Sequence, residues 1–330
     1  IFTNKLSIKK KQMMKKILLY TFLLISFIGF SQDEAEEGEG GWNKSGKITL
    51  LINQSAFLNW QPGGDNSFAG NLNLNYDLNY QKGDWTWDNK ILASYGLTNN
   101  KQEDASSARQ KDLGYRKTDD QLILNSTLGK KINGFWSASF FMNFNSQFQD
   151  GFDYEDDFID QNPTFSNEDF PTSGFLKPAY LSFGPGLLWK KNDDLSVNFS
   201  PLTPRFTFLG GEVFTYNNDD PNAVYYQSSN DVQTYGVAPG ESYLFEFGLN
   251  IRAYYKFDIM KNINMENIFN VFSDYLDKPQ NIDINYTMNL VMKINDVFST
   301  NLTFQTIYND NSYSGFQIRE VFGLGVNVNL

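Results

Sequence analysis

The stretch that decides the fold is Phe68–Gln81, which reads F-A-G-N-L-N-L-N-Y-D-L-N-Y-Q. Between Asn71 and Tyr80, every even position is Leu or Tyr and every odd position is Asn or Asp. Successive side chains of a β-strand point to opposite faces, so this alternation predicts a strand with one apolar and one polar face. An α-helix, with its period of about 3.6 residues, does not produce the pattern.

The same alternation recurs along the chain. We expect twelve strands, at about residues 47–59, 67–81, 84–98, 119–130, 134–148, 178–190, 194–209, 242–257, 262–275, 281–294, 297–308 and 316–330. Single-chain bacterial membrane barrels have an even number of antiparallel strands. The expected fold is therefore all-β, a 12-stranded antiparallel transmembrane β-barrel over residues 47–330.

The connections favour a membrane barrel over a soluble β-sandwich, whose strands are shorter, about five or six residues. Outer-membrane barrels have short periplasmic turns and longer extracellular loops. The three long connections, 99–118, 149–177 and 210–241, all fall at the same predicted end, the extracellular one.

Tryptophans lie at the predicted strand ends. The periplasmic ends carry Trp85, Trp87, Trp136 and Trp189, and an outer end carries Trp60. Such positions are typical of the aromatic belts at membrane interfaces.

The N-terminal residues predict export. Met14-Lys15-Lys16 precede an apolar stretch that ends at Gly29-Phe30-Ser31, which is typical of a secretory signal peptide cleaved before Gln32. The stretch is shorter than the about 20 apolar residues of a spanning helix. We interpret 1–13 as upstream translation, 14–31 as the signal peptide and 32–46 as an acidic, flexible periplasmic lead-in. The expected location is the bacterial outer membrane of a Gram-negative cell.

Composition excludes several classes of function. The net charge is −11, and loss of residues 1–31, with six Lys and no acid, makes it −17. So acidic a chain is not expected to bind nucleic acid. The chain has no Cys and no His. Disulfides, lipid-anchored Cys, thiolate metal sites and Ser-His-Asp or Cys-His catalysis are therefore excluded. We expect no cofactor and no enzymatic activity.

A short segment carries a family resemblance. Together with the barrel pattern and the signal peptide ending in F-S-Q, the segment Asn59–Ser67 (N-W-Q-P-G-G-D-N-S) resembles an uncharacterised Bacteroidota outer-membrane β-barrel family, domain of unknown function 3078. The resemblance implies a barrel whose substrate is unknown. It adds a location and no mechanism.

The same segment has two readings. Pro62-Gly63-Gly64-Asp65-Asn66 is typical of a tight outer turn, because Gly tolerates positive φ and Pro fixes its own φ. Alternatively, Trp60, Gly63, Gly64 and Asn66 form a pore-mouth turn at which Trp60 and Asn66 contact a ligand.

An acidic loop follows the fifth predicted strand. Asp150, Asp153, Glu155 and Asp157 supply the oxygen ligands that Ca²⁺ prefers. Their spacing does not match an EF-hand loop. A solvated loop, or one linked through divalent ions to lipopolysaccharide, is the alternative to a specific calcium site.

The strand at 194–209 predicts a bulge. It contains Pro201 and Pro204, and its apolar residues change from odd to even positions between Phe199 and Phe206. Proline cannot donate to the strand ladder, so we expect a bulge near 201–204 that aims Arg205 into the lumen. The bulge either forms a constriction or only shapes the wall.

The polar faces are expected to line the lumen. The charged lining residues are Asp77, Lys90, Arg205, Glu246, Arg252, Lys256, Asp283, Lys293 and Arg319. With Asp88 and Glu266, which also lie on inward faces, the signs nearly balance at six cations to five acids, so the lumen lacks the cationic ladder of channels for acidic sugars. Two interpretations remain open: charges that pair across a narrow interior, or a wall that selects solutes.

Two functions are consistent with these patterns. The first is a narrow channel for small polar solutes, neutral or zwitterionic. The second is a non-conducting structural or accessory subunit of an outer-membrane complex, motivated by Asn267 and Glu320, which are polar residues in outward registers. The expected partners are outer-membrane lipid and lipopolysaccharide, the barrel-assembly machinery through the C-terminal strand and, in the accessory role, other outer-membrane proteins.

Overall fold

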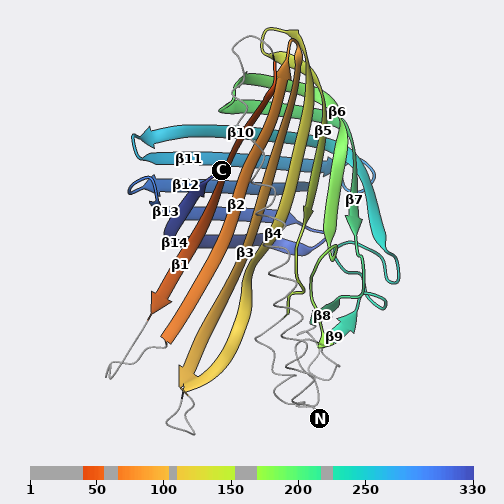
Figure 1. Ribbon diagram of the computed structural model, residues 1–330. Helices are drawn as coiled ribbons and strands as arrows, with labels where there is room; N and C mark the ends of the chain where they lie inside the picture. Colours follow the sequence, from red (N-terminus) through yellow and green to blue (C-terminus); the bar gives the residue numbers. More distant parts are fainter. Residues whose placement is uncertain (1–39, 56–65, 104–109, 153–168, 217–225) are drawn as a thin grey trace.

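Twelve antiparallel strands close into one barrel (Figure 1). The computed structural model describes residues 40–55, 66–103, 110–152, 169–216 and 226–330. The barrel strands are β1 (Trp42–Ser55), β2 (Asn66–Lys82), β3 (Trp85–Glu103), β4 (Gln110–Asn133), β5 (Trp136–Ser146), β6 (Ala179–Asn192), β7 (Leu195–Phe208), β10 (Tyr243–Met260), β11 (Ile263–Asp274), β12 (Ile282–Lys293), β13 (Phe298–Asn309) and β14 (Tyr313–Asn329). Each coincides with a strand predicted from the alternation, so the predicted fold is confirmed.

Consecutive barrel strands pair with each other, and β14 closes the barrel against β1. The closing register pairs Lys47–Ile52 of β1 with Leu324–Asn329 of β14. Short turns such as Gly83-Asp84 and Lys261-Asn262 lie at one end, called here the short-turn end. The opposite, long-loop end carries the connections between β5 and β6 and between β7 and β10.

Polar side chains fill the interior and apolar ones cover the exterior. Leu72 and Phe322 are 51% and 54% exposed, whereas Asn71 and Asn250 are 7% and 3% exposed. A soluble β-protein has the opposite arrangement, because its apolar face must leave water. An outward apolar band around a polar interior is the arrangement of membrane barrels.

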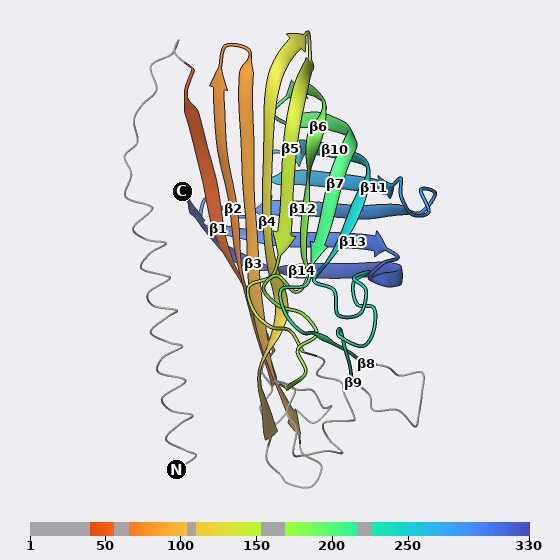
Figure 2. The ribbon, with the colours of Figure 1, turned by 90° about the vertical axis from the view of Figure 1, so that its right-hand side faces the viewer.

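Two walls of the barrel run in different directions. In Figures 1 and 2, β1 to β5 run steeply and β10 to β14 cross behind them at a large inclination. Strand tilt is what closes a barrel, and here it sets two crossing walls face to face. Side chains from opposite walls therefore meet inside the lumen. No helix of the described residues is long and apolar enough to cross a membrane.

Aromatic side chains gather at both ends of the apolar band. At the short-turn end Trp42 contacts Tyr80 and Trp87, with ring centroids 5.2 and 5.6 Å apart. Trp136 pairs with Trp189 across β5 and β6 at the same end. Towards the long-loop end, rings of β7 and β10 contact one another on the outer surface, with Phe206 stacked on Phe208 and with Tyr243 and Phe245 tilted against them. Trp60 lies outside the described residues.

Two boundaries differ from the sequence prediction. β1 begins at Trp42 and not at residue 47, so residues 42–46 are strand and not lead-in. The expected long loop at 99–118 is largely strand, because β3 continues to Glu103 and β4 begins at Gln110. These extensions are polar, so they lack the apolar alternation, yet their backbones still pair as a hairpin. Two long loops remain at this end among the described residues, not three.

The predicted bulge is present in β7. Its register against both β6 and β10 shifts between Phe199 and Arg205. The shift returns Arg205, Thr203 and Thr207 to the interior, where all three are buried. In β6, Gly184 and Gly186 accommodate the bulge, since a Cβ at either would collide with β7.

The second long loop folds over the long-loop end as a cap. Its two short strands, β8 (Phe214–Tyr216) and β9 (Tyr226–Ser228), form a hairpin. A small apolar cluster holds the loop, with Val213 and Val237 almost fully buried beside Leu209. We call residues 209–216 and 226–242 the outer cap. It also contacts the first long loop, because the Tyr235 hydroxyl donates to the Thr172 carbonyl oxygen at 2.9 Å.

Candidate functional site

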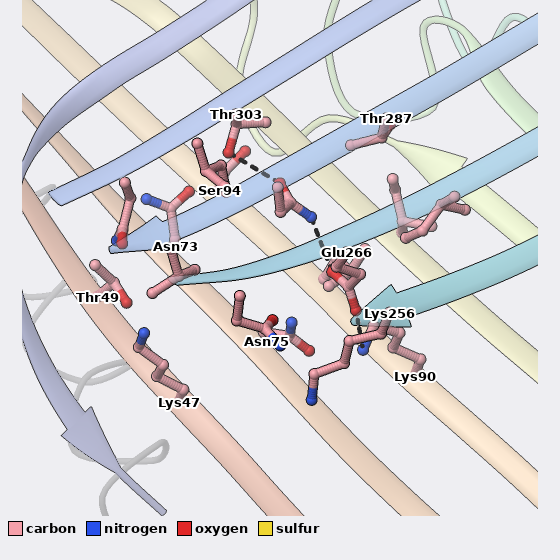
Figure 3. Close-up of a pocket in the computed structure, with 18 of the residues that line it drawn as sticks. Lys47, Thr49, Asn73, Asn75, Lys90, Ser94, Lys256, Glu266, Thr287 and Thr303 are labelled. Atoms are coloured by element: carbon pink, nitrogen blue, oxygen red, sulfur yellow. Dashed lines mark hydrogen bonds and ion pairs between the residues drawn. The ribbon is translucent and has the colours of Figure 1, made fainter. Parts of the chain in front are cut away.

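A polar cavity of about 610 Å³ occupies the short-turn half of the lumen (Figure 3). Its wall reaches the turn residues Lys261 and Asn262, so the cavity extends to the short-turn end. Asn73 and Asn75 of β2 face it from one wall, and Glu266 and Thr287 from the other. The volume lies in the range of small-molecule pockets, roughly 300–1,000 Å³.

A hydrogen-bonded network around Glu266 ties the two walls together. Lys90 of β3 lies between Asp77 and Glu266, 3.2 Å from an oxygen of each. The Tyr254 hydroxyl and the Asn289 amide donate to Glu266 at 3.0 and 2.9 Å. Because Glu266 is buried, these donors compensate for its lost hydration. The network sets the width of the lumen at this level.

Arg252 makes a second bridge across the lumen. From β10, its guanidinium donates to the side-chain oxygen of Asn125 on β4. Asn143 of β5 donates to the same oxygen at 2.7 Å. Arg252 therefore binds a neutral acceptor and keeps its positive charge facing the cavity.

Arg319 forms a septum between the cavity and the long-loop end. It lines the cavity and also a second hollow of about 300 Å³, which the start of the first long loop borders. From β14, the Arg319 guanidinium pairs with Asp119 of β4, which also accepts from the Asn71 amide at 2.6 Å. Asp119 is 6% exposed. We call Arg319, Asp119 and Asn71 the septum.

A buried ion triad crosses the lumen beyond the septum. Arg205 of β7 lies 2.5 Å from an oxygen of Glu246 on β10 and 2.5 Å from one of Asp283 on β12. Its guanidinium also stacks on Phe272, 3.9 Å from the ring centroid. One guanidinium thus forms ion pairs with two carboxylates in the half of the lumen that lies under the outer cap.

The structure divides the predicted lumen residues into two groups. The charges that pair inside the barrel are Asp77, Lys90, Arg205, Glu246, Asp283 and Arg319. Lys256 and Lys293 line the cavity and form no ion pair with any described residue. Arg252 lines it with a neutral partner. Pairing across the interior is therefore seen for these six charges, and a wall that selects solutes stays a prediction.

Sequence reasoning missed Lys47, Lys261, Asp119 and Asp120. Lys47 and Asp119 were the first residues of predicted strands, and Lys261 was the end of a predicted turn, so none was read as part of a polar face. Asp120 accepts from the backbone N–H groups of Phe148 and Gln149 at 2.7 and 2.9 Å. It thereby anchors the first long loop.

The pore-mouth and calcium predictions are largely outside the described residues. Trp60, Gly63 and Gly64 are not described, and Asn66 is the first residue of β2. Of the acidic loop only Asp150 is described, and its carboxylate lies 3.0 Å from Lys177. Among the described residues, no group of three or more acidic side chains is placed to hold a metal ion.

The fold and the cavity define a class of protein: a closed barrel of the outer-membrane type with a polar interior. A protein family described as Protein of unknown function (DUF3078) matches residues 52–152. The match covers β2 to β5, which supply one wall of the cavity, but less than half of the chain. No curated protein matches the chain.

Solved structures similar to the chain include proteins of the outer membrane. The translocator domain of the autotransporter NalP from Neisseria meningitidis is 10% identical, with 89% of each chain covered and a TM-score of 0.33. The outer membrane phospholipase A of Escherichia coli is 11% identical, covering 90% of this chain and 94% of its own, with a TM-score of 0.31. An outer membrane channel from Pseudomonas putida F1 is 9% identical, covering 91% and 98%, with a TM-score of 0.34.

Proposed function

We propose that the protein is a bacterial outer-membrane barrel that passes small polar solutes through its lumen, with the short-turn end in the periplasm. The observation that carries the proposal is the polar cavity, which extends to the short-turn end and stops at Arg319. A purely structural barrel needs no such cavity. The outward apolar band and the aromatic belts support the location in a membrane.

The septum is the proposed gate. Only Arg319, among the described residues, lines both the cavity and the hollow beyond it. Separating its guanidinium from Asp119 would join the two spaces. The pair is stabilised by charge, so a polar solute or an applied potential acts on it directly.

The test is conductance of the refolded barrel in planar bilayers, compared with Arg319→Ser. We expect a small unitary conductance for the unaltered chain and a rise of about threefold or more for the variant, because the narrowest constriction widens. Gln317→Ala is the matched control, since it alters the same face of β14 nearer the long-loop end. Heat-modifiable migration in detergent gels verifies that each sample is folded.

The alternative is a non-conducting structural or accessory barrel. It is favoured by the outer cap and by the ion triad, which occupy part of the long-loop half. Asn267 no longer supports it, because on the outer face of the sheet its amide donates to the Tyr255 carbonyl oxygen and accepts from the Tyr286 hydroxyl. Glu320 still does, as an exposed carboxylate in an outward register opposite Phe304. If neither the unaltered barrel nor Arg319→Ser conducts, the alternative replaces the channel.

A further inference from the structure

The cavity wall is strongly cationic although the chain is acidic. Its basic lining residues are Lys47, Lys90, Arg252, Lys256, Lys261, Lys293 and Arg319. Its acidic lining residues are Asp77, Asp258 and Glu266. Seven cations against three carboxylates leave a formal excess of four positive charges, or three once the pairing of Arg319 with Asp119 is counted, in a chain whose net charge is −11. The near balance of signs expected for the whole lumen does not extend to the cavity.

The excess arises because the charges separate along the barrel axis. The carboxylates of Asp119, Glu246 and Asp283 lie in the long-loop half, where each binds an arginine. At the other end, Lys47 of β1 and Lys293 of β12 both line the cavity and have no ion-pair partner among the described residues. Two cations that line one enclosed space stabilise an anion bound between them.

Neutral donors accompany these cations. Ser94 of β3 is 8% exposed, lines the cavity and has no hydrogen-bond partner for its hydroxyl among the described residues. Asn73 and Asn75 lie on the same wall as Ser94 and Lys47 (Figure 3), and the Thr49 hydroxyl beside them already donates to Asn327 at 2.9 Å. Amide and hydroxyl groups donate to oxyanions, and such bonds strengthen when the acceptor is charged.

We infer that this cavity binds small anions that carry carboxylate or phosphate groups and enter from the short-turn end. The inference rests on the proposed function and names its class of solute. Lys256, Lys261 and Lys293 at the mouth attract anions, and the enclosed walls focus that field. Lys47, Arg252 and Ser94 then supply donors inside. The chain thus selects for anions, in place of the neutral or zwitterionic solutes expected from the sequence.

The test removes three cavity lysines and compares a matched control. The cavity variant is Lys47→Gln, Lys256→Gln and Lys293→Gln, one from each of three strands. The control is Lys82→Gln, Lys131→Gln and Lys191→Gln, which removes three exposed lysines from the same end outside the cavity. Both change the net charge equally. Reversal potentials in a KCl gradient measure selectivity, and equilibrium dialysis of the folded barrel in micelles measures binding of inorganic phosphate.

We expect the unaltered chain and the control to prefer chloride over potassium and to bind phosphate. The cavity variant is expected to lose that preference and to bind phosphate about a hundredfold more weakly, because it removes three positive charges that attract phosphate in an enclosed site. If the barrel conducts but neither prefers anions nor binds phosphate, the anion site is wrong and the proposed channel stands. If the barrel binds phosphate through the cavity lysines but does not conduct, the anion site stands and the proposed channel is wrong. If the cavity variant and the control lose anion preference and phosphate binding equally, the inference is wrong, because the change in net charge then explains the loss.

Discussion

At the scale of single residues, Arg205 holds two buried carboxylates. Glu246 is 2% exposed and shares the guanidinium with Asp283. Buried ion pairs add little net stability when complete, because desolvation opposes the attraction. Removal of one partner is different, since it leaves charge buried without compensation.

We therefore expect Arg205→Met to destabilise the barrel by about 3–5 kcal/mol. Urea titration of the folded barrel in micelles, followed by tryptophan fluorescence, measures the change. Adding Glu246→Gln and Asp283→Asn should restore most of the loss, because the carboxylates are then neutral. Lys131→Gln, at an exposed position, is the control and should change stability by less than about 0.5 kcal/mol. A loss below about 1 kcal/mol for Arg205→Met contradicts the triad.

Partners across the lumen could not be predicted from the sequence. The alternation places Arg319 and Lys90 on inward faces, which the structure also shows. It does not show that Arg319 meets Asp119, which is 200 residues away in the sequence. That meeting depends on strand tilt and shear, which decide which strands face each other. The separation of the two signs along the axis has the same cause.

At the scale of elements, the signal that predicted the strands came from the apolar face alone. It located β12 and β13 to within one residue at either end, because their apolar alternation covers the whole strand. It missed the start of β4, where the residues are polar and the strand is held by pairing with β3. The bulge in β7 was predictable because two prolines coincide with a change of parity.

The packing of the outer cap against the first long loop depends on pH. Tyr235 donates its hydroxyl to Thr172, and burial raises the pKa of Tyr235 to about 12. A detached cap would release a tyrosine with an ordinary pKa of about 10. Docking is therefore fully favourable below pH 10 and weakens as the pH rises towards about 12, by on the order of 2–3 kcal/mol in total.

We expect an ultraviolet difference titration between the unaltered chain and Tyr235→Phe to show one tyrosinate with a midpoint near pH 12. A midpoint near pH 10, the ordinary value for tyrosine, would show that Tyr235 is not buried under the cap.

At the scale of the whole molecule, the two crossing walls produce an asymmetric lumen. The long-loop half holds the septum, the ion triad and the outer cap around the smaller hollow, and the arginines of the septum and the triad pair with carboxylates. The short-turn half keeps an open, cationic cavity. The proposed anion-selective wall therefore belongs to the short-turn half. The proposed channel also requires that the apolar exterior lies in lipid.

Adjacent residues of β2 test that requirement. Leu72 faces outward and is 51% exposed, whereas Asn73 lines the cavity. Leu72→Arg should destabilise the folded barrel in lipid vesicles by about 2–4 kcal/mol, the cost of arginine at the bilayer midplane. Asn73→Arg introduces the same side chain one residue away and should cost less than about 1 kcal/mol, because the cavity admits water. Urea titrations in vesicles measure both. Equal costs, or a larger cost for Asn73→Arg, would mean that the outward band does not lie in lipid.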